Sequence, residues 1–356
     1  MFVKQSRRAG TAAKNQENVK RVAAWEGRHP MGVFQTLAMP KELPPIIAVS
    51  LNTAIDRTLE VPDLEVGGHV RGRLVSIQPA GKAVNVARFL GTLGTPCILT
   101  GFVGEGDRHR FARSFAKTGV HVEVFEGHGH TRENITLIDP SRGIETHVRD
   151  VGFELSEDDL ERMKRKLGIL AMRRAYVIFA GSLPPGMDAE TFERLVAVCR
   201  DRNAYVAVDS SGPGLDGVRH GGPLWLVKPN REELAELTGR PVETDLQMHE
   251  AARRLLERVE LVVVTLGQEG ACLFTRAGAW RATPHLDPAE IVKTVGCGDA
   301  LLAGFVHAHA RGGAPEECLR RGVAVGSAAA LKARTGEVDL ADVERVYGTT
   351  EVKPFA

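Results

Sequence analysis

The segment Thr294–Asp299, Thr-Val-Gly-Cys-Gly-Asp, has the residue types and spacing to bind a phosphoryl group and to remove a proton beside it. Its two glycines allow a tight backbone turn, after which the apolar run 300–310 predicts a helix. Successive N–H groups at a helix N-terminus attract phosphate. The neighbouring aspartate, Asp299, can accept the proton of an attacking hydroxyl, as phosphoryl transfer requires. The alternative is an ordinary glycine turn in which Asp299 caps the helix.

Polar residues follow other predicted strands as well. Lys228, Asn230 and Glu233 lie where a strand ends and a helix begins. This position puts a cation and oxygen-bearing side chains near nucleotide phosphates and their Mg²⁺, although helix capping by Asn230 is the alternative. Asp56 follows the first strand, and the segment 81–85 opens the first helix. Capping alone would not demand Lys, Asn and Asp at so many strand-to-helix junctions, so these positions favour a ligand site.

The elements that position these residues alternate along the chain from about residue 45. Runs rich in Val, Ile and Leu, such as 46–51 and 261–267, predict buried strands, and amphipathic segments between such runs predict helices. This alternation predicts an α/β fold with a mostly parallel sheet covered by helices on both faces. Two stretches, 57–78 and 121–150, contain short alternating segments that predict antiparallel strands. Because ligands bind beyond the carboxyl ends of the strands in such sheets, these pieces would form a lid.

The composition excludes several classes of function. Charged residues make up 26% of the 356-residue chain and the formal net charge is +1, which gives no reason to expect nucleic acid or an anionic membrane as a partner. No run approaches the roughly 18 consecutive apolar residues of a transmembrane helix. The five cysteines are scattered along the chain, which is typical of reduced thiols in a cytoplasmic protein.

The chain divides into three parts by composition. Residues 1–44 contain eight Lys and Arg residues against three Glu, and their weak apolar periodicity predicts a disordered N-terminal extension. Residues 45–348 carry the alternating pattern and predict a single domain that includes the lid. Residues 349–356 predict a C-terminal tail.

Three motifs of other functions are incomplete. The Gly-Lys pair at 81–82 is not a phosphate-binding P-loop, because no glycine stands five residues before it and no Ser or Thr follows it. The segment 212–217 matches the dinucleotide-binding pattern Gly-x-Gly-x-x-Gly, but the residues after it do not predict a helix. Gly-Ser-Leu at 181–183 is not a hydrolase nucleophile elbow.

Six segments, in order along the chain, resemble the ribokinase-like (PfkB) carbohydrate kinases. They are 80–94, 131–132, 180–186, 208–212, 226–233 and 295–305, and the similarity extends from about Ile46 to Tyr347. Several look like the branch that phosphorylates sugar phosphates, which contains 1-phosphofructokinase and tagatose-6-phosphate kinase. The resemblance implies a ribokinase-like three-layer sandwich with a small antiparallel β lid, ATP and Mg²⁺ as cofactors, and a homodimer formed through the lid.

The resemblance also implies a role for each candidate residue. Asp299 would be the general base, and the N–H groups of Gly296, Cys297 and Gly298 would bind the transferring phosphoryl group. On the nucleotide side, Lys228 would contact ATP phosphates, Asn230 and Glu233 would organise Mg²⁺, and Thr265, Gly267 and Gly270 would border the nucleotide. On the sugar side, Asp56, Gly81 and Asn85 would hold the sugar, and Lys82, Arg132 and Ser182 would face the phosphate that it already carries.

Two departures from the family pattern lie on the sugar side. Ala80 and Ala83 stand where the family usually has glycine, and the segment 147–153 replaces a stretch rich in glycine and proline. The predicted reaction is phosphorylation of a sugar phosphate, with fructose 1-phosphate ahead of tagatose 6-phosphate and fructose 6-phosphate. One alternative is a kinase for an unphosphorylated sugar or a nucleoside, against which the cations on the sugar side argue. The other is a catalytically silent sugar-binding regulator, against which the retained Asp299 argues.

Overall fold

A computed structural model of the chain describes residues 43–355. Residues 1–42 and 356 lie outside this part, so the predicted disorder of residues 1–44 falls almost entirely outside the described residues. Within residues 43–355, no helix is long and apolar enough to cross a membrane.

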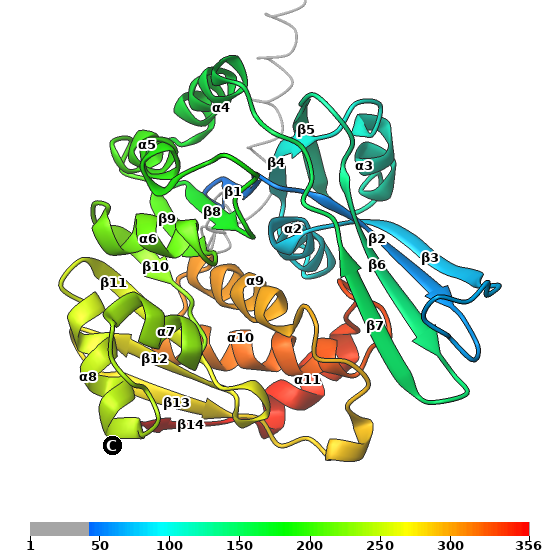
Figure 1. The fold of residues 1–356 in the computed structure, drawn as a ribbon. Coiled ribbons are helices and arrows are strands. Elements are labelled where there is room, and N and C mark those ends of the chain that lie inside the picture. Colours follow the sequence, from blue (N-terminus) through cyan, green and yellow to red (C-terminus); the bar gives the residue numbers. More distant parts are fainter. Residues whose placement is uncertain (1–42, 356) are drawn as a thin grey trace, which may run out of the picture. The chain divides into compact units, whose positions relative to one another are not determined.

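The main sheet combines parallel and antiparallel strands. Its strands are β1 (Ile46–Ser50), β4 (Cys97–Val103), β5 (Val120–Glu126), β8 (Tyr176–Ala180), β9 (Tyr205–Asp209), β10 (Leu224–Val227), β11 (Val259–Thr265), β12 (Ala271–Thr275), β13 (Ala279–Thr283) and β14 (Glu351–Pro354). They form a ten-stranded sheet in the order β14-β13-β12-β11-β10-β9-β8-β1-β4-β5. Neighbouring strands are parallel from β5 to β11 and antiparallel from β11 to β14. The predicted α/β fold with a mostly parallel sheet is confirmed (Figure 1).

Helices cover both faces of this sheet. They are α2 (Lys82–Thr92), α3 (Arg108–Ser114), α4 (Glu157–Leu170), α5 (Ala189–Arg200), α6 (Pro213–His220), α7 (Arg231–Thr238), α8 (Asp245–Leu255), α9 (Cys297–Ala310), α10 (Pro315–Ala330) and α11 (Leu340–Thr349), with short 3₁₀ turns at Gly267–Glu269 and Pro288–Glu290. Along β1, Ile46 and Ala48 belong to the hydrophobic core beneath α2, α9 and α10, whereas Ile47 and Val49 belong to the core beneath α4, α5 and α8. Because both faces of the strand are buried, β1 is a continuous apolar run, and the molecule has the predicted three layers.

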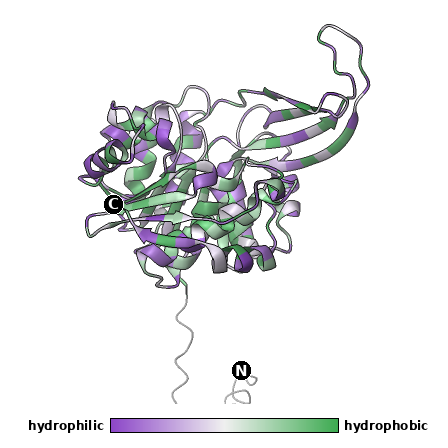
Figure 2. Ribbon diagram, turned by 90° about the horizontal axis from the view of Figure 1, so that it is seen from below, coloured by the Kyte–Doolittle hydropathy of each residue, from purple (hydrophilic) through white to green (hydrophobic). Residues whose placement is uncertain are grey.

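A second sheet projects from the carboxyl ends of the parallel strands and forms the lid. It contains β2 (Ala54–Glu60), β3 (Arg73–Ala80), β6 (Arg132–Asp139) and β7 (Ile144–Arg149), in the order β3-β2-β6-β7. The outer pairs are antiparallel, as predicted, and the central pair β2–β6 is parallel. Along these strands hydrophilic and hydrophobic residues alternate (Figure 2), which gives the lid one polar and one apolar face.

Two boundaries differ from the sequence prediction. The segment 121–126, expected in the lid, is β5, which pairs in parallel with β4 at the edge of the main sheet. As an edge strand, β5 is buried on one side only, so its residues alternate between apolar and polar. This alternation is the same as that of a lid strand, and the sequence does not distinguish the two. The expected C-terminal tail contains β14, which pairs antiparallel with β13 and completes the other edge.

The prediction that the residues after the glycine pattern at 212–217 form no helix is wrong in part, because α6 spans Pro213–His220 and ends three residues after the pattern. The glycines there have packing roles. A Cβ atom on Gly214 would lie 2.0 Å from Ser210 Oγ, and one on Gly217 would lie 2.7 Å from the Phe192 ring. Tertiary contacts with α5 therefore hold this short helix in place.

Candidate active site

The catalytic candidates lie at the carboxyl ends of the parallel strands, between the lid and the N-terminus of α9. Asp209 is the last residue of β9, Lys228 follows β10, and Asp299 lies in the first turn of α9. All three are buried, with exposed fractions of 1%, 5% and 5%. Elements far apart in the sequence thus bring ionisable groups together in an environment where their charges interact strongly.

The glycine turn before α9 has the geometry expected of a phosphoryl-binding loop. Gly296 has φ of 88°, and a Cβ atom there would lie 2.7 Å from Thr335 Cγ2, so the position requires glycine. A Cβ atom on Gly298 would lie 3.2 Å from Lys228 Nζ, which places this ammonium beside the turn. The Cys297 N–H donates a long hydrogen bond of 3.3 Å to Thr294 O, whereas the Gly298 N–H has no acceptor within residues 43–355.

Asp299 has the environment of a general base rather than of a helix cap. Its side chain makes no capping hydrogen bond, and its Oδ2 accepts one from Asn85 Nδ2 at 2.8 Å. Burial, and then the negative charge of Asp209, raises the pKa of Asp299 to about 7. A carboxylate of this pKa can take a proton near neutral pH, which suits general-base catalysis. Asn85 Oδ1 is buried without a hydrogen-bond partner inside residues 43–355.

Lys82 and Lys228 are both paired with Asp209, which was not among the predicted site residues. Lys82 Nζ donates to Asp209 Oδ1 at 2.9 Å, and Lys228 Nζ lies 3.1 Å from Asp209 Oδ2. Burial favours the neutral acid, but the two ammonium groups hold the pKa of Asp209 below its usual range. Lys82 is therefore not the unpaired cation that the sequence suggested. Asp209 ends a predicted strand, so the rule that selected Lys228 could have found it.

The polar face of the lid carries Asp56, Arg132 and Asn134. In the register of β2 with β6, Ala54 is opposite Arg132 and Asp56 is opposite Asn134, so these side chains share one face. Asn134 Nδ2 donates to Asp56 Oδ1 at 2.9 Å. Gln78 of β3, opposite Asp56, donates to Thr335 O at 3.3 Å, and Thr335 contacts the glycine turn before α9. The polar lid face is thus connected to the glycine turn before α9.

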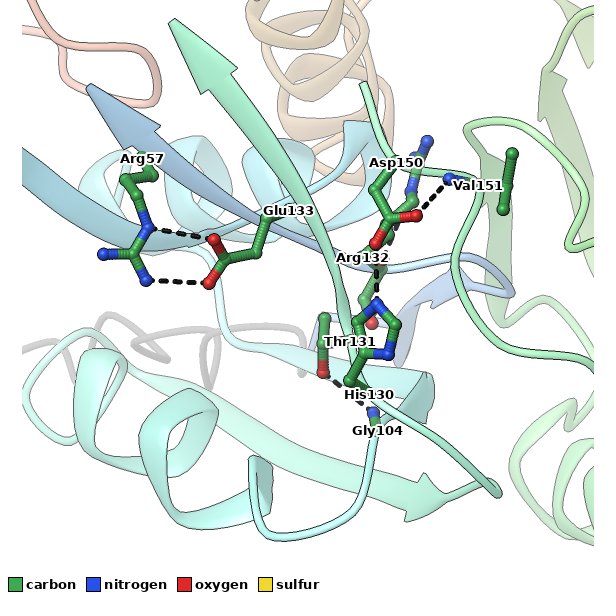
Figure 3. Close-up of polar contacts among 9 residues, drawn as sticks. Arg57, Gly104, His130, Thr131, Arg132, Glu133, Asp150 and Val151 are labelled. Atoms are coloured by element: carbon green, nitrogen blue, oxygen red, sulfur yellow. Dashed lines mark hydrogen bonds and ion pairs between the residues drawn. The ribbon is translucent and has the colours of Figure 1, made fainter. Parts of the chain in front are cut away.

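Arg132 lies where the lid joins the main domain (Figure 3). Its guanidinium donates to the backbone oxygens of Asn52 and Thr53 at 3.1 and 3.3 Å, and burial lowers its pKa. No carboxylate within residues 43–355 lies within 4 Å of it. The Asn52 side chain donates to Ser182 Oγ at 3.4 Å. Both predicted phosphate contacts, Arg132 and Ser182, therefore form a hydrogen bond with Asn52.

A cavity of about 620 Å³ lies on the other side of the glycine turn. This volume is typical of a small-ligand site. Its wall includes the predicted nucleotide residues Asn230, Thr265, Gly267 and Gly270, together with Cys297 and Gly298. Gly270 has φ of 90° and its Cβ atom would lie 2.0 Å from Ala282 O, so only glycine fits there. Sequence reasoning missed the apolar part of the wall, which includes Leu286, Ile291, Leu301 and Val323.

Asn230 and Glu233 form a reciprocal cap at the N-terminus of α7. Asn230 Oδ1 accepts from the Glu233 N–H at 2.8 Å, and Glu233 Oε2 accepts from the Asn230 N–H at 2.9 Å. The capping alternative for Asn230 is therefore present in the structure. Glu233 Oε1 accepts no hydrogen bond from the part of the chain that is described.

The loop that opens α2 tolerates its two alanines. Gly81, at the N-cap, has φ of 122°, a conformation that requires glycine. Neither Ala80 nor Ala83 has a positive φ, and both side chains are buried in the core. The two alanines therefore cost no backbone strain.

Comparisons with known proteins identify the family of the chain. The chain is 38% identical over 265 residues to the 1-phosphofructokinase of Rhodobacter capsulatus, covering 74% of this chain and 83% of that protein. It is 33% identical over 294 residues to the 1-phosphofructokinase of Vibrio cholerae, covering 82% and 91%. The crystal structure of phosphofructokinase-2 from Escherichia coli in complex with potassium superimposes with a TM-score of 0.80 at 27% identity, covering 86% and 98%. Residues 47–341 match the pfkB family of carbohydrate kinases, and the chain belongs to this family.

Proposed function

We propose that the acceptor of this ATP-dependent sugar-phosphate kinase is fructose 1-phosphate, and that Asp299 is the base that activates its hydroxyl. The activity named for both relatives supports this acceptor. The observation that carries the proposal is the position of Asp299. It lies next to Cys297 and Gly298, which line the nucleotide cavity, and it accepts a hydrogen bond from Asn85 on the sugar side.

In the proposed reaction, Asp299 accepts the proton of the sugar hydroxyl as that oxygen attacks the γ-phosphorus of ATP. The bond from the γ-phosphorus to the bridging oxygen breaks, and ADP leaves. Charge spreads over the transferring phosphoryl oxygens, where the Gly298 N–H and the Lys228 ammonium would stabilise it. Arg132 would bind the phosphate that the sugar already carries, because its charge has no carboxylate partner within residues 43–355.

We propose that Mg²⁺ accompanies the nucleotide and that Glu233 is the protein group that holds it. Bound there, the ion would neutralise the ATP phosphates. Magnesium sites of this kind use one or two carboxylates together with substrate phosphates. The residues fit that pattern, since Glu233 Oε1 is uncommitted and residues 43–355 contain no group of three His, Cys, Asp or Glu side chains that could hold a metal alone.

Glu233→Gln should raise the Mg²⁺ concentration for half-maximal activity by roughly tenfold. Glutamine also serves at the third position of a capping box, so α7 should keep its cap while the negative charge is lost. The measurement is initial rate against Mg²⁺ concentration at saturating ATP. Glu232→Gln is the matched control, because Glu232 is the exposed neighbour and does not face the cap. An unchanged titration for Glu233→Gln would remove this residue from the metal site.

We also propose a homodimer formed through the lid and a cytoplasmic location. Aliphatic side chains on the apolar lid face support the dimer, since Leu74, Ile77 and Val148 are 50%, 41% and 51% exposed. The five free cysteines, four of them buried, support a reducing compartment. Light scattering of the full chain should give about twice the 38.6 kDa mass of one chain. A mass of one chain across the working concentration range would rule the dimer out.

Phosphorus NMR tests the proposed reaction without assuming a product standard. The full chain, incubated with fructose 1-phosphate, ATP and Mg²⁺, should convert ATP to ADP and yield a sugar with two phosphomonoester signals. Without the sugar phosphate, ADP should form only slowly. No new phosphomonoester signal with any sugar phosphate would refute the proposal.

A further inference from the structure

The carboxylate of Asp209 joins two cations that serve different ligands. Its side chain is completely buried, with Lys82 Nζ 2.9 Å from Oδ1 and Lys228 Nζ 3.1 Å from Oδ2. Lys82 is the first residue of α2, on the sugar side, and its side chain is 37% exposed. Lys228 follows β10 and lies beside Gly298, which lines the nucleotide cavity. One carboxylate therefore connects the two halves of the site.

Lys228 would be destabilised in its position without this carboxylate. The Lys228 side chain is 6% exposed, and an unpaired ammonium buried to that degree is costly. The Lys82–Asp209 contact is an aligned hydrogen bond, whereas the Lys228 contact has the distance of an ion pair without that alignment. Lys228 Nζ also lies beside Gly298, where it can reach an incoming phosphate.

Asp299 is surrounded by the same charges. Lys82 and Asn85 face it from α2, Asp209 from β9, Lys228 from β10, and Cys297 precedes it on α9. Burial and the negative charge of Asp209 oppose its ionisation, and the two lysines favour it. Any change at Asp209 must therefore alter the proton affinity of Asp299 as well as the positions of the lysines.

We propose that Asp209 is a positioning residue for phosphoryl transfer, which holds Lys82 and Lys228 on opposite sides of the reacting groups. It contacts neither substrate and acts through the three residues around it. This inference rests on the proposed function, since it takes Asp299 as the base. A purely structural ion pair would stabilise the fold without changing how the base titrates.

Asp209→Asn separates these roles, because it removes the charge and keeps the shape. The kcat/KM for fructose 1-phosphate should fall by roughly tenfold or more, the effect of losing a hydrogen bond to a charged group. Without the repulsion from Asp209, and with both lysines freed toward Asp299, the pKa of the base should fall. The acid limb of the kcat/KM profile should therefore move to lower pH, by about one unit. The substrate phosphate titrates identically in the assays of every variant. A difference in the acid limb between a variant and the wild type therefore comes from a titrating group of the enzyme.

The matched control is Asp216→Asn on α6, where the carboxylate is 48% exposed and pairs with Arg219 at 3.4 Å. It should leave both the rate and the pH profile unchanged. Wild-type enzyme is assayed first, so an absence of transfer to any sugar phosphate refutes the proposed function before Asp209 is tested. A folded Asp209→Asn protein with an unshifted acid limb would overturn the inference.

A second comparison covers the case in which Asp209→Asn does not fold. The double variant Lys82→Met with Asp209→Asn removes both members of one pair and leaves fewer unpaired charges. The acid limb of the double variant should lie below that of Lys82→Met alone, because only the double variant lacks the repulsion between Asp209 and Asp299. An acid limb at the same pH in both variants would contradict the proposal.

Discussion

Asp299→Asn should lower kcat by roughly 10²–10⁴-fold while the protein keeps its fold and its ATP affinity. The carboxylate is the proposed acceptor of the hydroxyl proton, and an amide of the same shape cannot take that proton. The hydrogen bond from Asn85 Nδ2, 2.8 Å long in the wild type, can be kept if the amide oxygen faces it. The measurement is single-turnover kinetics at saturating ATP and sugar phosphate, together with calorimetric binding of ATP.

Thermal unfolding provides the control for this variant. The pKa of Asp299 is raised by burial to about 7, above the value in an unfolded chain. Between the pKa of an unfolded aspartate, about 3.9, and this value, the native state therefore binds more protons than the unfolded state, and its stability falls as the pH rises. Above this window the ionised carboxylate destabilises the fold. Asparagine removes this cost, so the melting temperature at pH 8 should be equal to or above that of the wild type. A folded variant with near-wild-type turnover would show that Asp299 is not the base.

Arg132→Ala should lower kcat/KM for the sugar phosphate by roughly 10–150-fold, because a hydrogen bond to a charged group contributes about 1.5–3 kcal/mol. The KM for ATP should remain nearly unchanged, since Arg132 belongs to the lid and not to the wall of the nucleotide cavity. The loss should be much smaller with an unphosphorylated sugar as acceptor. Steady-state kinetics with both acceptors at saturating ATP measure the difference.

Arg57→Ala is the matched control for the second variant. Arg57 lies on the opposite face of the same lid. Its Nε and Nη2 donate hydrogen bonds of 2.9 and 2.8 Å to the Glu133 carboxylate (Figure 3). Arg57→Ala therefore also removes one positive charge from the lid, but from the face opposite to that of Arg132. Equal losses for Arg57→Ala and Arg132→Ala would indicate a general effect on the lid. A silent Arg132→Ala would contradict the assignment of this residue to the sugar phosphate.

Most of the fold and the central part of the candidate site could be predicted from the sequence, because both depend on the order of strands and helices. Buried apolar strands that alternate with helices form a parallel sheet, and residues at the carboxyl ends of such strands converge. Lys228 was identified on that basis, and Asp299 from the glycine turn that precedes α9. Gly296 and Gly270 were identified from turn patterns, and each occupies a conformation with positive φ.

What the sequence could not provide were the partners of these residues. Lys82 and Arg132 both appeared as cations available to a phosphate, yet Lys82, the first residue of α2, pairs with Asp209, the last residue of β9. Such a pairing depends on tertiary distances that no local pattern encodes. The same limit explains the edge strands β5 and β14, whose half-buried patterns do not distinguish one sheet edge from another.

The measurement that tests the central claim most directly is kcat/KM of the full chain for a panel of acceptors with ATP and Mg²⁺. The panel contains fructose 1-phosphate, tagatose 6-phosphate, fructose 6-phosphate, fructose, ribose and a nucleoside. Fructose 1-phosphate should give the highest value, and fructose should be poorer by roughly 10–150-fold or more, the contribution of the charged contact to its phosphate. A higher kcat/KM for fructose, ribose or the nucleoside than for every sugar phosphate would contradict the account.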